Sequence, residues 1–111
     1  MTTSASTSAD PAVARLLAIL VEELRPLQVW LFGSRAEGRA RPDSDYDVLV
    51  VLPDDAPAAD FDDRRVWRLG DRAGVVADIV PCTKSEFDGE KDLVDTLPRA
   101  ASLRGRLLYE R

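Results

Sequence analysis

The segment DYDVLVVL, residues 45–52, constrains the fold more than any other part of this 111-residue chain. Its last five residues are all apolar, so both sides of an extended strand would carry hydrophobic side chains. Such a strand is stable only in the centre of a sheet that is covered on both faces. The segment therefore predicts a central strand in a layered fold. It also places two carboxylates, Asp45 and Asp47, at the mouth of that strand.

The rest of the chain alternates between helical and extended patterns. Short apolar runs predict three further strands, at 27–32, 75–81 and 106–110, and the first two of these are expected to be buried. Apolar spacing and capping residues predict three helices: 11–25 after Asp10, one within 53–74 that ends at Gly74, and one from Thr96 to about Gly105. A further capping-box pattern joins Thr83 to Glu86. This alternation predicts an α/β fold with a small mixed sheet flanked by helices.

Length and composition limit the class of protein. A chain of 111 residues forms one domain, expected over 10–111, after a flexible polar tail, 1–9, that lacks the features of a secretory signal. The net charge of −5 argues against direct nucleic-acid binding, and no apolar run is long enough to span a membrane. The lone Cys82 cannot form an internal disulfide, which is typical of a cytoplasmic protein. The absence of histidine excludes a histidine base.

Three aspartates are candidates for a metal site. Asp45 and Asp47 alternate with Tyr46, so they project from one face of a strand, roughly 6–7 Å apart at Cα. Asp78 lies inside another apolar run, VVADIV, where an unpaired carboxylate would cost several kcal/mol. If the two strands are neighbours, the three carboxylates converge, and a divalent cation would relieve their repulsion. Oxygen ligands without histidine or cysteine favour magnesium or manganese.

The pair Gly33-Ser34 supplies a complementary anion site. Glycine permits close backbone approach, and the N–H groups of the first turn of a helix point toward an anion. Ser34 and Glu37 match a capping box, which predicts a short helix directly after the strand. Arg35 is the best placed arginine to contact a phosphate. Carboxylates beside such a turn are typical of metal-assisted phosphoryl or nucleotidyl transfer, although the loop is not a Walker P-loop.

These residues also carry a family resemblance. Gly33-Ser34, ten residues and then Asp45-x-Asp47 resembles the G-S-x10-D-x-D signature of the nucleotidyltransferase superfamily that includes DNA polymerase beta. Over about 27–81 the chain is similar to its smallest branch, the minimal nucleotidyltransferase (MNT) domains. Asp78 lies where that family places its third carboxylate. One departure is Glu37, where many members have a basic residue.

The resemblance implies a polymerase-beta-like fold and a role for each residue. Ser34 and the backbone of Gly33 would hold the β- and γ-phosphates of ATP, and the three aspartates would bind Mg²⁺. Asp78 would lie nearest the attacking hydroxyl and help to deprotonate it. An acceptor oxygen would then attack the α-phosphate and expel pyrophosphate.

The resemblance also implies a partner, because a core of this size leaves no second domain to bind an acceptor. It favours the antitoxin of HEPN/MNT toxin–antitoxin pairs, in which a small MNT protein transfers AMP to a tyrosine of a HEPN ribonuclease. Two alternatives stay open. One is a non-catalytic antitoxin that neutralises its partner by binding, and the other is a nucleotidyltransferase for a small molecule such as an aminoglycoside.

Each candidate residue also has a purely structural interpretation. Ser34 could serve only as a helix cap, Asp45 could form a turn, and Asp78 could pair with a core arginine. Trp30 and Trp67 are expected in the core or at a partner contact. The acidic residues of the segment 54–63 are expected to form a solvated surface.

Overall fold

A four-stranded mixed sheet in the order β3-β2-β1-β4 forms the centre of the molecule. The computed structural model describes residues 10–33, 35–36, 38, 45–93 and 96–111. Strand β2 runs antiparallel to β1 and parallel to β3, and β4 runs antiparallel to β1. The elements in chain order are α1 (Pro11–Leu24), β1 (Gln28–Phe32), β2 (Tyr46–Leu52), a 3₁₀ helix (Ala58–Phe61), α2 (Asp63–Ala73), β3 (Ala77–Thr83), α3 (Lys84–Glu90), α4 (Leu97–Arg104) and β4 (Arg106–Glu110).

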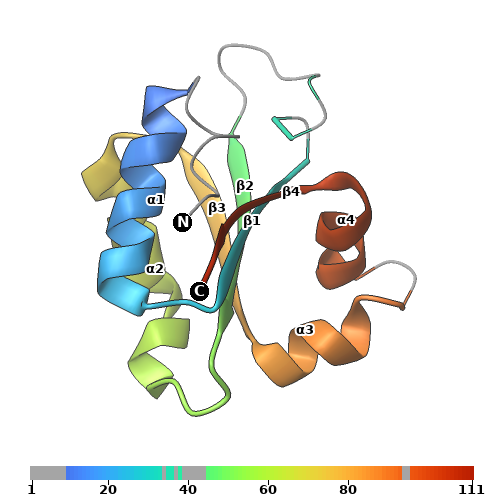
Figure 1. The fold of residues 1–111 in the computed structure, drawn as a ribbon. Coiled ribbons are helices and arrows are strands. Elements are labelled where there is room, and N and C mark those ends of the chain that lie inside the picture. Colours follow the sequence, from blue (N-terminus) through green and yellow to red (C-terminus); the bar gives the residue numbers. More distant parts are fainter. Residues whose placement is uncertain (1–9, 34, 37, 39–44, 94–95) are drawn as a thin grey trace.

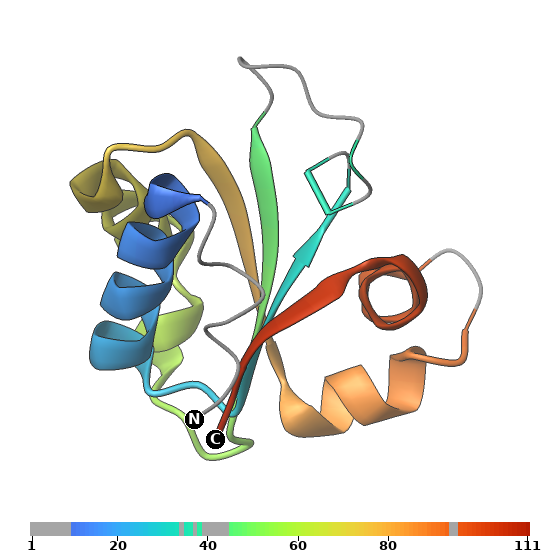
Figure 2. The ribbon, with the colours of Figure 1, turned by 45° about the horizontal axis from the view of Figure 1, so that its top comes forward.

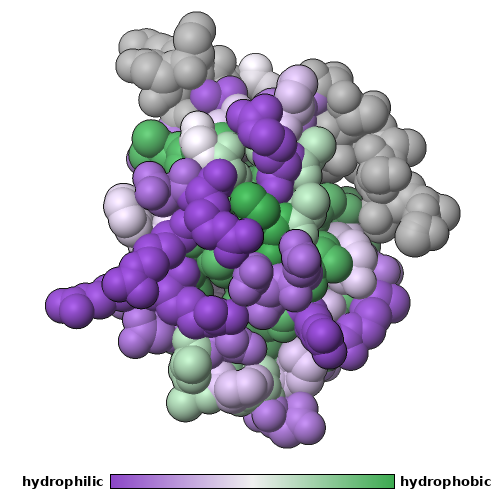
Figure 3. Space-filling model, turned by 90° about the vertical axis from the view of Figure 1, so that its left-hand side faces the viewer, coloured by the Kyte–Doolittle hydropathy of each residue, from purple (hydrophilic) through white to green (hydrophobic). Residues whose placement is uncertain are grey.

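Helices cover both faces of this sheet. Helices α1 and α2 lie on one face, and α3 and α4 lie on the other (Figures 1 and 2). The outward face of the α1–α2 layer is largely hydrophilic (Figure 3). Alternate residues of β2 contribute to the two cores: Val48 and Val50 join the larger cluster with α1, and Leu49 and Val51 join the smaller one. The predicted α/β class and the central position of 45–52 are confirmed.

The helices begin and end at the capping residues that the sequence predicted. The side chain of Asp10 accepts a hydrogen bond of 3.0 Å from the N–H of Ala12, at the start of α1. Gly74 ends α2 with φ +75°, and the reciprocal capping box of Thr83 with Glu86 begins α3. These predictions are confirmed, and Thr96 begins α4 as expected.

Strand β3 differs from the prediction of a buried strand. It lies at the edge of the sheet, and most of its residues are half-buried or exposed, Asp78 among them. Pro81, inside this strand, fits an edge position. Proline has no backbone N–H, and at an edge this missing donor can face away from the neighbouring strand. The expectation that Asp78 is a desolvated core carboxylate is therefore wrong.

One acidic residue also departs from its prediction. Asp60, expected on a solvated surface, is only 8% exposed. Its Oδ1 lies 3.4 Å from Nε of Arg65, whose guanidinium also donates a 3.2 Å hydrogen bond to the main-chain oxygen of Glu23. The ion pair joins the 3₁₀ helix to α2, and the hydrogen bond to Glu23 joins α2 to the end of α1. The arginine offsets the cost of a carboxylate inside the molecule.

Several predictions lie outside the described residues. These are the flexible tail over 1–9, the capping box of Ser34 with Glu37, and most of the loop over 38–44. Within the described part of the chain, no helix is both long and apolar enough to cross a membrane.

Candidate functional site

Two of the three predicted carboxylates occupy equivalent positions on neighbouring strands. In the parallel pair of β2 and β3, Asp47 is the register partner of Asp78. Residues paired in this way point to the same face of a sheet, here the face that α3 and α4 cover farther along the strands. Asp45 is exposed and comes one residue before β2. The topology therefore brings Asp47 and Asp78 together near the N-terminal ends of both strands.

The pKa of Asp47 reflects how close the other two aspartates are. Partial burial raises the pKa of the Asp47 carboxyl, and the negative charges of Asp78 and then Asp45 raise it further. All three causes act against the ionised form. The charges of the two other aspartates thus act on Asp47, and a cation bound beside it would act in the opposite direction and favour the ionised carboxylate.

Gly33 lies directly against the Asp47 carboxylate. It follows Phe32, the residue of β1 that pairs with Asp47. A Cβ built on Gly33 would lie 2.3 Å from Oδ2 of Asp47, and the backbone φ of +74° is one that other residues rarely adopt. The turn continues through a 3.1 Å hydrogen bond from the N–H of Ala36 to the oxygen of Gly33. The predicted anion-binding turn and the predicted metal site therefore adjoin each other, with Gly33 as the point of contact.

Arg35 lies on the same turn, over an aromatic ring. Its guanidinium carbon is 4.1 Å from the ring centroid of Tyr46, within the range of a cation–π interaction. The hydroxyl of Tyr46 donates a 3.0 Å hydrogen bond to Asp10, and burial raises the pKa of Tyr46. The first residue of β2 thus holds Arg35 near the start of that strand. The predicted phosphate ligand Ser34 lies outside the described residues.

The described residues do not form a complete metal cage. Within the described ranges, no group of three or more histidine, cysteine, aspartate or glutamate side chains lies close enough to hold an ion. The sequence predicted three carboxylates converging on one point, whereas the structure brings Asp47 and Asp78 into register with Asp45 at the strand entrance. The chemistry of the donors still fits magnesium, because all are carboxylates and their mutual repulsion favours a divalent cation.

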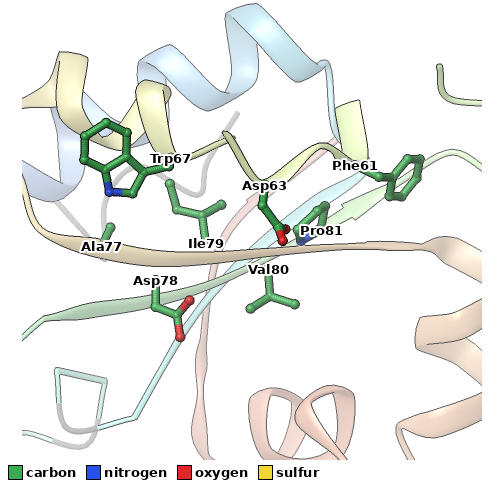
Figure 4. A pocket seen from close by; sticks show the side chains of 8 residues that line it. All are labelled: Phe61, Asp63, Trp67, Ala77, Asp78, Ile79, Val80 and Pro81. Atoms are coloured by element: carbon green, nitrogen blue, oxygen red, sulfur yellow. The ribbon is translucent and has the colours of Figure 1, made fainter. Parts of the chain in front are cut away.

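Sequence reasoning missed the surroundings of Asp78. A cavity of about 410 Å³ runs along β3, lined by residues of that strand and by Phe61, Asp63 and Trp67. Asp78 and Val80 point to one side of β3, while the other labelled side chains lie on the α2 side (Figure 4). Trp67 is 63% exposed, so it is not a core residue. Pro81 was the sequence signal for an edge strand and hence for an open flank here.

Cys82 does not contribute a nucleophile. It is buried on the face that carries Asp47 and Asp78, and burial raises the pKa of its thiol to about 12. The charges of Glu86 and Glu90 act in the same direction. A thiol with such a pKa is protonated at neutral pH and unreactive.

Replacement of Asp47 by asparagine is expected to stabilise the metal-free protein at pH 7. Because folding raises the pKa of Asp47 above its ordinary value of 3.8, the native state holds this proton more tightly than the unfolded chain. Stability therefore falls as pH rises from 3.8 through the raised pKa, and it stays lower above that pKa. Thermal unfolding in EDTA should give Asp47→Asn the higher melting temperature at pH 7, with a difference that shrinks toward pH 4. A wild type that is equally or more stable at pH 7 would contradict this prediction.

Comparison with known proteins defines the family and the fold. A family model described as a nucleotidyltransferase domain matches residues 13–101. A search of curated proteins found no match. Among solved structures, a toxin–antitoxin complex with AMP-PNP contains a chain that is 16% identical, with a TM-score of 0.61, over 88% of this chain and 73% of that one.

Two more solved structures have the same fold. One is a mutant of the toxin–antitoxin complex MntA–HpeT, with 15% identity, a TM-score of 0.62 and coverage of 88% of this chain and 73% of that chain. The other is a putative nucleotidyltransferase from Sulfolobus solfataricus, with 22% identity, a TM-score of 0.51 and coverage of 92% and 89%. At these identities the likeness shows a shared fold, and the match over 13–101 shows the family.

Proposed function

Because the chain belongs to the nucleotidyltransferase domain family, we propose that it transfers AMP from ATP to a hydroxyl group of a partner protein, with magnesium as cofactor. The observation that carries the proposal is the placement of Asp47 beside Asp78, with Gly33 against the Asp47 carboxylate. A carboxylate pair next to a glycine turn supplies, side by side, ligands for a cation and a place for phosphate oxygens. We propose Asp45, Asp47 and Asp78 as the metal ligands and catalytic residues.

The nucleotide would lie across the turn between β1 and β2. The backbone at Gly33 can approach a phosphate closely because no side chain stands in the way. Ser34 and Arg35 are the proposed further ligands of the triphosphate, and the guanidinium of Arg35 is held beside β2 by Tyr46. Bound magnesium would neutralise phosphate charge and polarise the α-phosphate.

Asp78 is the proposed contact with the acceptor. Its exposure leaves the carboxylate accessible to a hydroxyl group, and its register with Asp47 keeps it near the proposed nucleotide. Asp78 would accept the hydroxyl proton while the acceptor oxygen forms a bond to the α-phosphorus. The bond from that phosphorus to the oxygen bridging the α- and β-phosphates breaks, and pyrophosphate leaves with the bonding electrons.

The proposed acceptor is a tyrosine of a HEPN-type toxin, which makes this chain a cytoplasmic antitoxin of the minimal nucleotidyltransferase kind. This assignment is supported by two solved structures with this fold that come from toxin–antitoxin complexes. The MntA–HpeT mutant carries two aspartate-to-glutamate exchanges at positions two apart, which is the spacing of Asp45 and Asp47.

The test is transfer to a defined protein. Purified cognate HEPN toxin, incubated with this protein, ATP and Mg²⁺, is expected to gain the mass of AMP on a tyrosine and to lose ribonuclease activity. The same mixture with EDTA should give unmodified toxin. Intact-mass spectrometry and peptide mapping provide the measurement. If the toxin is silenced without any mass change, the protein acts by binding alone, and the proposed chemistry is wrong.

A further inference from the structure

The outer edge of β3 has hydrogen-bonding groups that the sheet does not use. The N–H of Tyr46 donates to the oxygen of Val76 at 3.0 Å, and Tyr46 is the register partner of Ala77. In a parallel ladder this pattern turns the N–H and C=O groups of alternate residues toward the neighbouring strand. Ala77 and Ile79 therefore turn their N–H and C=O groups outward, and Pro81 turns its C=O outward. No described strand pairs with this edge.

Only the half of this edge near Asp78 can accept another strand. Pro81 has no N–H, and the N–H of Thr83 is already donated at 2.8 Å to Oε1 of Glu86. The available outward donors are therefore those of Ala77 and Ile79, on either side of Asp78. A short extended segment that paired here would be held beside the proposed catalytic carboxylate.

The cavity along this edge is lined by both apolar and acidic side chains. Phe61, Trp67 and the side chains of β3 form its apolar walls, whereas its charged lining residues are Asp63 and Asp78. No lysine or arginine is among the described residues that line it. Trp67 is exposed and lies with Asp63 on the α2 side of this edge, which suits a cationic side chain that can lie on the indole face and pair with that carboxylate.

We propose that this edge docks an extended, basic segment of the acceptor protein, which adds to β3 and brings its hydroxyl group to Asp78. The inference rests on the proposed function, since it names how the acceptor of that reaction binds. Main-chain hydrogen bonds at Ala77 and Ile79 hold the segment in register. Trp67 and Asp63 select basic flanking residues, and Pro81 limits the pairing to a few residues.

The test uses Trp67 as its own reporter. The chain has two tryptophans, and Trp30 stacks on Phe87 with ring centroids 5.8 Å apart, so Trp30→Phe leaves Trp67 as the only indole. This variant is titrated with the peptide Val-Arg-Tyr-Arg-Val and with the control Val-Glu-Tyr-Glu-Val, both acetylated and amidated, because the residues next to the tyrosine of an added strand point to the opposite face, where Trp67 and Asp63 lie. The basic peptide is expected to change Trp67 fluorescence saturably and to bind about tenfold more tightly or better. Equal responses, or no response to either peptide, would overturn the proposal.

Two pairs of variants separate charge from strand pairing. Asp63→Lys should remove the preference for the basic peptide, while Asp71→Lys, on the same helix but outside the cavity lining, should retain it. Ala77→Pro removes one outward N–H and should weaken both peptides, whereas Ala77→Ser keeps that donor. Circular dichroism verifies folding of each variant. If Ala77→Pro folds and binds as well as Ala77→Ser, strand addition is wrong.

This experiment can fail independently of the proposed function. Peptide binding needs neither ATP nor turnover, so docking without AMP transfer would count against the chemistry alone. Trp67→Ala should leave ATP affinity unchanged, as should Leu103→Ala, a control at a residue that is 64% exposed outside the cavity. If Trp67→Ala weakens ATP binding and Leu103→Ala does not, the cavity binds the nucleotide rather than the acceptor. Concentration-dependent dimers abolished by Ala77→Pro would assign the edge to a second copy. Either outcome overturns the proposal.

Discussion

Replacing Asp45 and Asp47 together by asparagine is expected to reduce AMP transfer by about 10³-fold or more, because the loss of metal ligands removes several kcal/mol of transition-state stabilisation. The fold should persist, since Asp45 is exposed and the charge of Asp47 is unfavourable in the metal-free protein. The rate is measured with radiolabelled ATP and the cognate toxin. Calorimetry with ATP should show Mg²⁺-dependent binding in the wild type and little difference with Mg²⁺ in the double variant.

A matched control for this change is the pair Asp55→Asn and Asp71→Asn, which removes two exposed charges outside the site. That variant should transfer AMP at the wild-type rate. Growth of cells that carry the toxin then distinguishes the alternatives. Under the enzymatic hypothesis the double variant at Asp45 and Asp47 no longer protects the cell. If it protects fully, the protein neutralises its partner by binding.

Gly33→Ala is expected to lower AMP transfer by about 10²-fold, the effect of moving a catalytic group by about 1 Å. The new Cβ would lie 2.3 Å from Oδ2 of Asp47, so the carboxylate or the turn has to shift. The positive φ of +74° adds about 1–2 kcal/mol of backbone strain. Steady-state kinetics and thermal unfolding measure the two effects separately.

Gly74→Ala is the control, because Gly74 has a φ of +75° and a Cβ added there would meet no described atom within 4 Å. This variant should lose stability to backbone strain of the same size and keep its activity. A double-mutant cycle on stability isolates the contact between the added Cβ and the Asp47 carboxylate. In an Asp47→Ala background, Gly33→Ala should lower the free energy of unfolding only by the amount seen for Gly74→Ala. An equal cost in both backgrounds would mean that Gly33 does not position Asp47.

The sheet was predictable where both faces of a strand are apolar. The five apolar residues at the end of 45–52 require cover on both sides, and β2 is central for that reason. The caps at Asp10, Gly74 and Thr83 were predictable because each satisfies backbone groups within a few residues in the sequence.

The edge position of β3 was not predicted, because VVADIV has the same apolar character as a central strand. The position of a strand in the sheet depends on which segments become its neighbours, and this is not visible in the strand's own residues. Within β3, only Pro81 indicates that one side of the strand is unpaired. Asp78 was misplaced for the same reason. It was expected in the interior because its strand was expected to be buried, and it lies exposed beside a cavity. The exposure of Trp67 depends on this edge as well, so its helical pattern alone could not place it.

The register of β2 with β3 also determines how the chain tolerates changes in length. The loop and helix between these strands leave the sheet and return to it, so insertions or deletions there need not disturb the pairing of Asp47 with Asp78. A single residue inserted between Ala77 and Asp78 would instead turn the carboxylate to the α1–α2 side of the sheet. Insertions and deletions should therefore be tolerated in the loop between β2 and α2 and excluded at the start of β3.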